Sequence, residues 1–178
     1  TRLGIGIADA AAQAMMAGWL IGMFVLGVMA GSYAGFRAGP RRPAAILLLV
    51  AFLLTCAALL GGFGYVGAAV TFLALAMGAE NATFERNGEV SVGLTYMTGA
   101  LVKLGQRLTL ALLGGNRWEW VPYAGLWLGL VMGAVGGASA ASRIGLDSLW
   151  PAAVFAALLA LAAGRIAETR GTENAPPN

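Results

Sequence analysis

No charged residue interrupts the stretch PAAILLLVAFLLTCAALLGGFGYVGAAVTFLALAMGA, which covers residues 43–79. At 1.5 Å per residue, a single helix of this length would be about 55 Å long, whereas the hydrocarbon core of a bilayer is about 30 Å thick. One membrane crossing cannot use that length. The stretch therefore predicts two short spans, folded at Gly61-Gly62-Phe63-Gly64, where glycine lets the backbone reverse.

Three more stretches of the sequence are long and apolar enough to span a membrane. They cover residues 14–36, which end at Arg37, residues 121–142, which end before Arg143, and residues 149–164. Together with the two spans of the 43–79 stretch, they make five. The sequence thus predicts an all-α fold, a polytopic transmembrane helical bundle.

The composition of the chain agrees with a membrane protein and excludes other classes. Of the 178 residues, 59% are hydrophobic and 11% are charged, and the mean hydropathy is +0.78. An average soluble domain has about 25% charged residues, so a small soluble enzyme and a disordered chain are excluded. The net charge of +3 fits loops that face anionic lipid rather than nucleic acid.

The chain has no histidine and a single cysteine, Cys56, in the middle of an apolar run. This excludes His/Cys metal sites, Cys–His nucleophiles and a disulfide framework. A general base would have to be Glu80 or Asp9 alone. We therefore expect no enzymatic activity, no catalytic residue, no metal and no cofactor.

A segment of different character, residues 80–119, separates the third span from the fourth. From about residue 100 to residue 113 its pattern becomes that of an amphipathic helix. Leucines 101, 104, 108 and 112 share one side of this helix, and Lys103, Gln106 and Arg107 share the other. Such a helix lies in the membrane interface or, as a half-helix, lines a polar cavity.

The distribution of lysine and arginine predicts the orientation of the chain in the membrane. If the loop with Arg37, Arg41 and Arg42 is cytoplasmic, only Arg2 and Arg143 among the 11 basic residues lie outside. The reverse orientation would export most of these charges. We expect a cytoplasmic C-terminus and a polar, disordered tail over residues 165–178.

The chain also repeats itself at an offset of 106 residues. Six identical pairs carry the match: Val25/Val131, Gly27/Gly133, Gly31/Gly137, Ala34/Ala140, Arg37/Arg143 and Gly39/Gly145. Upstream the offset shortens to 101, and an insertion of about five residues between Gly114 and Glu119 explains the change. Three spans, an odd number, separate a position from its copy, so the sequence predicts an inverted repeat of the kind found in secondary transporters.

The repeat divides the chain into three parts. Residues 1–62 are the remainder of a first repeat with two spans, residues 63–164 are a second repeat with three spans, and residues 165–178 are the tail. The second repeat has one more span at its start, and the chain lacks an initiating methionine. We expect a parent protein with six spans, of which the first is missing here.

The segment Gly78-Ala79-Glu80-Asn81-Ala82-Thr83-Phe84-Glu85-Arg86, followed by Thr95-Tyr96-Met97-Thr98-Gly99 and Leu104, resembles the signature of the YoaK-like family. The resemblance covers essentially the whole chain. It implies an uncharacterised bacterial inner-membrane protein with six spans and no established substrate. Family members carry a related acidic and Met-Thr-Gly-Asn motif near the N-terminus, which also implies a span before residue 1.

Glu80 and Asn81 are the first candidates for a binding site, because they close the third span. A carboxylate at the bilayer centre costs about 2.5–3.5 kcal/mol on insertion scales, so a buried one needs a partner or a function. In one interpretation Glu80 lies in a central cavity and titrates or coordinates a cation, with Asn81 as its polar partner. In the other, both residues lie at the hydrated cytoplasmic interface.

Thr95, Thr98, Gly99 and Lys103 are the second group of candidates. A helix that starts after Thr98-Gly99 has free backbone N–H groups and a positive dipole end. At membrane depth this is the half-helix ion site of transporters, and Lys103 adds a preference for anions. The alternative is a capping threonine on an interfacial helix whose cations bind lipid phosphates.

Glycines spaced four residues apart indicate close helix packing. They are Gly27, Gly31 and Gly35 in the first span and Gly129, Gly133 and Gly137 in the fourth.

The sequence favours a small-solute transporter or channel with a polar site between two inverted repeats. The alternative is a non-transporting membrane scaffold or a lipid-interacting protein. The expected partners are the lipid bilayer and a solute or ion of unknown identity, and a homo-oligomer is left open.

Overall fold

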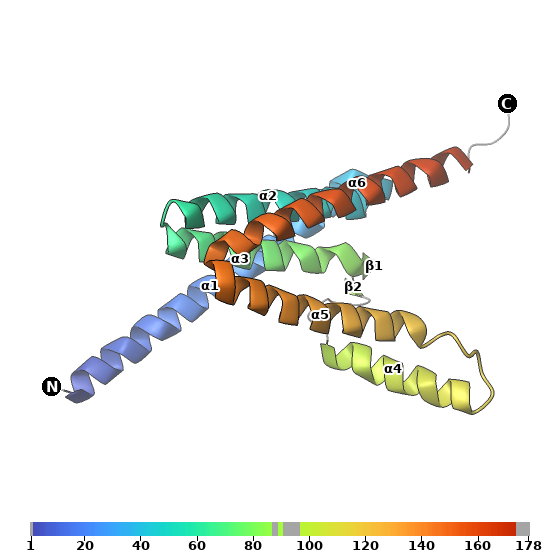
Figure 1. Ribbon diagram of the computed structural model, residues 1–178, viewed down its shortest axis with the longest axis horizontal. Helices are drawn as coiled ribbons and strands as arrows, with labels where there is room; N and C mark the ends of the chain where they lie inside the picture. Colours follow the sequence, from blue (N-terminus) through green and yellow to red (C-terminus); the bar gives the residue numbers. More distant parts are fainter. Residues whose placement is uncertain (1, 87–88, 91–96, 174–178) are drawn as a thin grey trace. The chain divides into compact units, whose positions relative to one another are not determined.

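The computed structural model describes the backbone of residues 2–86, 89–90 and 97–173, and the side chains of residues 10–83 and 98–169. Within these limits the chain consists of helices joined by turns and short loops, with one short antiparallel pairing of β1 (Glu85–Arg86) with β2 (Glu89–Val90) (Figure 1). The α-helices are α1 (Arg2–Ala38), α2 (Arg42–Gly62), α3 (Val66–Asn81), α4 (Met97–Leu112), α5 (Val121–Ile144) and α6 (Leu149–Glu173). The all-α prediction is confirmed.

Each of the five stretches predicted as spans lies within one helix of the described structure. Two continuous helical stretches, Ala10–Gly62 and Val121–Thr169, are long and apolar enough to cross a membrane by length and composition. The shorter apolar helix α3 covers Val66–Asn81. How many of these helices cross the bilayer stays a prediction.

The chain forms two compact units. The first contains residues 1–83 and 149–178, and the second contains Phe84–Ser148. These units do not coincide with the two sequence repeats, because compactness follows contacts in space whereas the repeats follow similarity along the chain. The division into repeats therefore stays a prediction.

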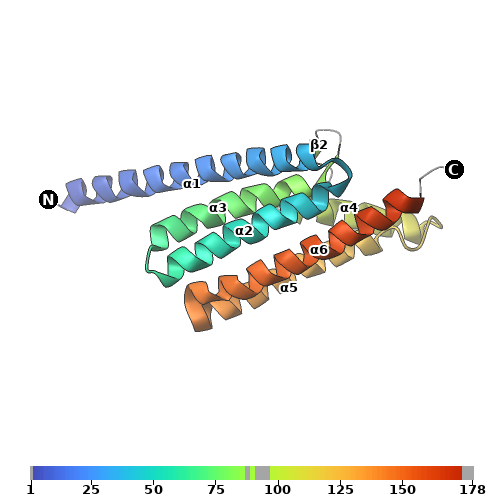
Figure 2. The ribbon, with the colours of Figure 1, turned by 90° about the horizontal axis from the view of Figure 1, so that it is seen from above.

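In the first unit, helices α1, α2, α3 and α6 pack side by side, with α3 and α2 between α1 and α6 (Figure 2). Gly27 of α1 faces Leu75 of α3, and Gly31 faces Ala79. The facing residues follow the same order along both helices, so α1 and α3 run parallel. Helix α2 runs antiparallel to both, because only a short turn joins it to each.

The predicted reversal within residues 43–79 is confirmed. Helix α2 ends at Gly62 and α3 begins at Val66, and Gly64 in the turn has a φ of 82°. The N–H of Gly64 donates to the carbonyl of Gly61, and the N–H of Tyr65 donates to the carbonyl of Leu60 at 2.9 Å. This is the Schellman pattern, in which a left-handed residue, here glycine, closes the last turn of a helix.

The crossing of α1 and α3 brings two backbones together with no side chain between them. A Cβ at Gly27 would overlap the carbonyl oxygen of Leu75, and a Cβ at Gly31 would lie 2.6 Å from that of Ala79. From the other helix, a Cβ at Gly78 would overlap the carbonyl oxygen of Phe24. The indole Nε1 of Trp19 adds a 3.2 Å hydrogen bond to the Thr71 hydroxyl. Small residues on both helices thus permit backbone contact.

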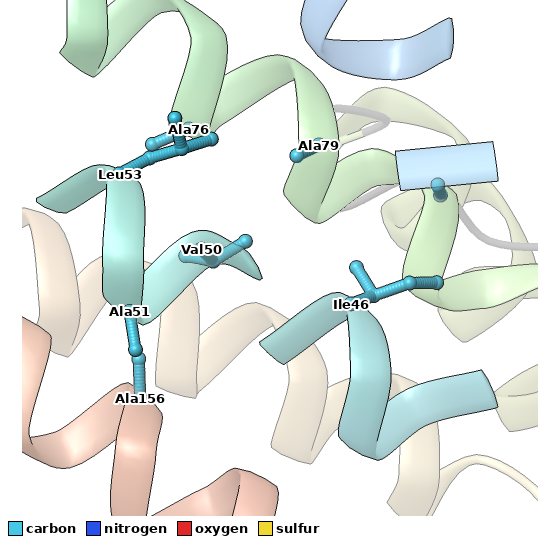
Figure 3. Close-up of a cluster of buried hydrophobic side chains, with 8 residues drawn as sticks. Ile46, Val50, Ala51, Leu53, Ala76, Ala79 and Ala156 are labelled. Carbon is cyan, nitrogen blue, oxygen red and sulfur yellow. The ribbon is translucent and has the colours of Figure 1, made fainter. Parts of the chain in front are cut away.

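The core of the first unit consists mainly of small side chains (Figure 3). Its largest fully buried side chain is Ile46 of α2. Ala76 and Ala79 come from α3, and Ala156 of α6 points toward Ala51 of α2. Large apolar side chains, by contrast, are often exposed, and Phe36 is 81% exposed. This inside-out arrangement is what an apolar solvent allows, since lipid removes the need to bury large hydrophobic groups.

Two predicted helix limits differ from the structure. Helix α6 does not end at Gly164 but continues to Glu173, so residues 165–173 of the expected disordered tail are helical. Glu168 in this extension forms an ion pair with Arg41, which ties the last turns of α6 to the start of α2. Helix α4 begins at Met97, three residues before the expected start.

The substitution Gly27→Ala should destabilise the first unit, because the added methyl group has no room beside the α3 backbone. Overpacking of this kind costs about 1–3 kcal/mol. Thermal unfolding of the purified protein in detergent, followed by circular dichroism, should show a lower midpoint.

Gly22→Ala is the matched control on the same helix, since no described atom lies within 4 Å of a Cβ there. Its midpoint should stay the same or rise, because alanine favours a helix over glycine by about 1 kcal/mol. Equal effects at positions 22 and 27 would contradict the close crossing.

Candidate functional site

The polar residues Glu80 and Asn81 lie in the last turn of α3, as the sequence indicated. Asn81 is 8% exposed, and its Nδ2 atom donates a 2.7 Å hydrogen bond to the Met77 carbonyl one turn earlier in the same helix. The Glu80 side chain is half-buried. The neighbours Gly78 and Ala79 are buried because they face α1, which directs the end of α3 against the other helices.

Arg42 is a third polar residue at this end of α3, and the sequence interpretation placed it only in a loop. It is the first residue of α2, and its Nη2 atom donates a 3.1 Å hydrogen bond to the Ala82 carbonyl, directly after α3. The last carbonyls of a helix carry partial negative charge, so a guanidinium is well placed there. Arg42 thus links the start of α2 to the end of α3.

Gly35 provides the space that Arg42 needs. A Cβ at Gly35 would lie 2.9 Å from the Cγ of Arg42 and 3.0 Å from the Cδ1 of Ile46. The arginine stem therefore lies flat on the last turns of α1 before it reaches Ala82. Gly35 was predicted as a packing glycine, and its neighbour is a charged side chain rather than a helix backbone.

The same end of the first unit carries other charges. Arg41 forms a 3.1 Å ion pair with Glu168, and both side chains are well exposed. Exposed pairs of this kind contribute at most about 1 kcal/mol. Arg37, in the last turn of α1, is exposed. Glu80 thus belongs to the end of the unit that carries these charges, and its depth in the membrane stays a prediction.

The second group of predicted site residues belongs to the second unit. Thr95 lies outside the described residues. Thr98 and Gly99 lie in the first turn of α4 rather than before it, because the helix begins at Met97. Their backbone N–H groups are among the four that a helix start leaves without an intrahelical acceptor. The Thr98 side chain is exposed.

The cationic side of α4 faces the start of α5. The Nζ of Lys103 lies 6.0 Å from the ring centroid of Tyr123, at the outer limit of a cation–π contact. Arg107 forms an ion pair with Glu119. These two pairs follow one antiparallel register, so they hold α4 and α5 together as a hairpin.

The structure thus brings together part of each predicted set. Glu80 and Asn81 lie in one unit and Thr98, Gly99 and Lys103 in the other, so a shared cavity stays a prediction. No described atom lies within 4 Å of a Cβ at Gly129, Gly133 or Gly137, and packing at these glycines stays a prediction too. Among the described residues, no three Asp, Glu, Cys or His side chains gather as metal ligands.

Comparison with known proteins places the chain in a family. Residues 1–162 match a family model described as "Protein of unknown function (DUF1275)". The chain belongs to this family. No solved structure matches it.

A curated relative of this DUF1275 protein is the UPF0700 transmembrane protein RA0705 of Rhizobium meliloti (strain 1021). The two are 40% identical over 127 residues, which cover 70% of this chain and 55% of the relative. The chain thus spans about half the length of the relative it matches. The expectation of an uncharacterised membrane family is confirmed, whereas the YoaK-like assignment stays a prediction.

The substitution Arg42→Ala should destabilise the protein, because it removes the charged donor at the end of α3 and leaves a gap over Gly35. Hydrogen bonds to charged groups contribute about 1.5–3 kcal/mol. The midpoint of thermal unfolding in detergent should fall accordingly.

Arg41→Ala is the matched control one residue away. Its side chain is exposed and paired only with the exposed Glu168 side chain, so the loss should stay within about 1 kcal/mol. A larger effect at Arg41 than at Arg42 would rule out the proposed link between α2 and α3.

Proposed function

We propose that this protein is a small-solute transporter or channel of the bacterial inner membrane rather than an enzyme. Five spans form two inverted repeats, and the C-terminus is cytoplasmic. The antiparallel packing of α2 against α6 carries the proposal, because these two helices are copies of each other at the 106-residue offset. Their packing supports an inverted arrangement of the repeats.

The local structure supports the repeat itself. Helix α1 ends at Ala38 and α5 ends at Ile144, which are 106 residues apart. A glycine with positive φ follows each helix, Gly39 at 54° and Gly145 at 58°, and each glycine begins a short 3-10 helix. The identical pair Gly39/Gly145 thus has the same backbone role in both copies, since a positive φ favours glycine.

The register of the α2–α6 pair supports the inversion. Arg41 faces Glu168, Ala44 lies 3.8 Å from a Cβ built on Gly164, and Ala51 meets Ala156. As the residue numbers increase along α2, those of the facing residues on α6 decrease, so the helices are antiparallel. The offset of 106 maps Ala51 onto residue 157, the neighbour of Ala156. At the centre of the contact, Ala51 therefore faces a residue next to its own copy in the other repeat. A two-fold axis between inverted repeats requires this arrangement.

The cytoplasmic orientation is supported by the charges at one end of the first unit. Because α6 is antiparallel to α2, its C-terminal part with Arg165 lies at the same end as Arg37, Arg41 and Arg42. Basic residues that flank spans favour the cytoplasmic side.

In this proposal Glu80 binds the solute or a coupling cation at the inner end of the pathway. Its side chain is half-buried in the last turn of α3, and Asn81 stiffens the same turn through its bond to Met77. Alternating access would exchange the conformations of the two repeats across the α2–α6 contact. Thr98, Gly99 and Lys103 remain a separate candidate set for solute binding, in the second unit.

The alternative is a membrane scaffold or lipid-interacting protein without transport. One observation favours it: the amide of Asn81 and the guanidinium of Arg42 both bond to backbone carbonyls at the end of α3. Their donors satisfy backbone carbonyls at the helix end, so fewer hydrogen-bonding groups remain to bind a solute.

Labelling of single cysteines should place the two glycine turns on opposite sides of the membrane. In a Cys56→Ser background, Pro40→Cys and Asp147→Cys introduce exposed thiols beside Gly39 and Gly145. A membrane-impermeant maleimide added to intact cells should react with position 147 and, only after lysis, with position 40. Reaction of both from the same side would eliminate the inverted repeat.

Transport is tested in proteoliposomes loaded with a pH-sensitive dye and challenged with a potassium diffusion potential. The wild-type protein should carry protons or exchange them for potassium above the rate of protein-free vesicles, and Glu80→Gln should abolish the difference. Glu168→Gln, the same change at an exposed glutamate on α6, is the control and should keep the flux. Equal flux for Glu80→Gln and wild type would remove the role of Glu80.

A further inference from the structure

The tip of the α4–α5 hairpin gathers large apolar side chains in an exposed position. Leu112 is 85% exposed, Leu113 79% and Trp118 74%. All three belong to the end of α4 or to the loop that joins it to α5 (Figure 1). Arg117, beside Trp118, is also exposed.

Hydrogen bonds hold this loop in a defined shape. The N–H of Gly115 donates to the Leu110 carbonyl at 2.9 Å, and Gly114 has a φ of 93°, so α4 ends in a Schellman turn. The Asn116 Oδ1 accepts a 3.1 Å hydrogen bond from the N–H of Trp118. The backbone conformation of this loop therefore holds the apolar side chains in exposed positions.

Next to the tip, Arg107 is neutralised by its ion pair with Glu119. Lys103, one turn further from the tip, lies over the uncharged ring of Tyr123. Within the described part of the chain, Arg117 has no recorded ion pair or hydrogen bond. The tip thus combines two leucines, a tryptophan and an unneutralised arginine.

We propose that this tip, residues 112–118, inserts into the headgroup region of an anionic lipid leaflet. Tryptophan is enriched at that depth because its ring is apolar and its N–H is polar. Leucine side chains bind the boundary between headgroups and acyl chains, and arginine is attracted to anionic headgroups. A protruding tip with these side chains fits a lipid surface better than a protein groove.

In the proposed repeat, the tip corresponds to the insertion within the second copy. The first copy is the unbroken helix α1, whereas the second is α4, a loop and α5. The extra residues between Gly114 and Glu119 lie in that loop. Their presence in only one copy marks the tip as an addition to the helical unit rather than part of its core.

The experiment uses the full chain in vesicles with Trp118 as its only tryptophan, the other four being changed to phenylalanine. Lipids brominated near the headgroup end of the acyl chain should quench Trp118 fluorescence about twofold more than lipids brominated near the methyl end. Strong quenching by aqueous iodide would overturn the proposal. So would protection from both kinds of quencher, which would indicate a protein neighbour.

The role of Arg117 is tested by the lipid charge. In mixtures of phosphatidylcholine and phosphatidylglycerol, quenching by the brominated lipid should increase with the phosphatidylglycerol fraction, and Arg117→Gln should remove this dependence. Arg143→Gln, at the other end of α5, is the matched control and should keep it. An unchanged dependence in Arg117→Gln would overturn the proposed contact with anionic headgroups.

A second measurement covers the case in which the single-tryptophan protein does not fold. A spin label on Trp118→Cys, in the Cys56→Ser background, reports depth from its relative accessibility to oxygen and to a water-soluble nickel chelate. Greater accessibility to oxygen supports insertion, and greater accessibility to the chelate overturns it.

Discussion

The contact on which the first unit depends is the backbone crossing of α1 and α3. Lipid tails are as apolar as leucine, so helices in a membrane gain little from hiding large side chains and more from close van der Waals packing. Gly27 and Gly31 on one helix and Gly78 on the other bring carbonyl oxygens within contact distance of the facing backbone. Because both helices contribute glycine, a larger residue on either one would separate them.

The crossing also sets the geometry of the polar end of the unit. It fixes the end of α3 beside the last turns of α1, where Gly35 leaves room for the Arg42 side chain. Arg42 then reaches the Ala82 carbonyl and satisfies part of the helix end. Gly35 thus makes room for a charged side chain, whereas Gly27 and Gly31 make room for the backbone of α3.

Chain length and charge were sufficient to predict much of this fold. The charge-free stretch of residues 43–79 is too long for one crossing and has a glycine cluster at its middle, so the reversal at Gly64 followed from the sequence. The apolar stretch of residues 121–142, which ends before Arg143, predicted α5 in the same way. These features are local, and local chemistry decides them.

The parts that the sequence did not reveal depend on contacts between distant segments. The extension of α6 beyond Gly164 accompanies the ion pair of Glu168 with Arg41, 127 positions earlier. The sequence does not distinguish Arg42 from Arg37 and Arg41. Arg42 is the one that packs against Gly35 and reaches the end of α3. The hydrogen bond of Asn81 to the Met77 carbonyl could not be predicted either. An asparagine that is exposed or that binds a ligand can have the same neighbours in the sequence.

The insertion that distinguishes the second proposed repeat lies outside the α2–α6 contact. The insertion between Gly114 and Glu119 precedes α5, and the 106-residue offset holds from Val25 onward through both glycine turns. An extra loop can therefore be accommodated at the hairpin tip without a shift in the register of Ala51 against Ala156. A lipid-binding addition and a two-fold helical pair are compatible in one chain, because the first acts at the membrane surface and the second is set by small residues within the helices.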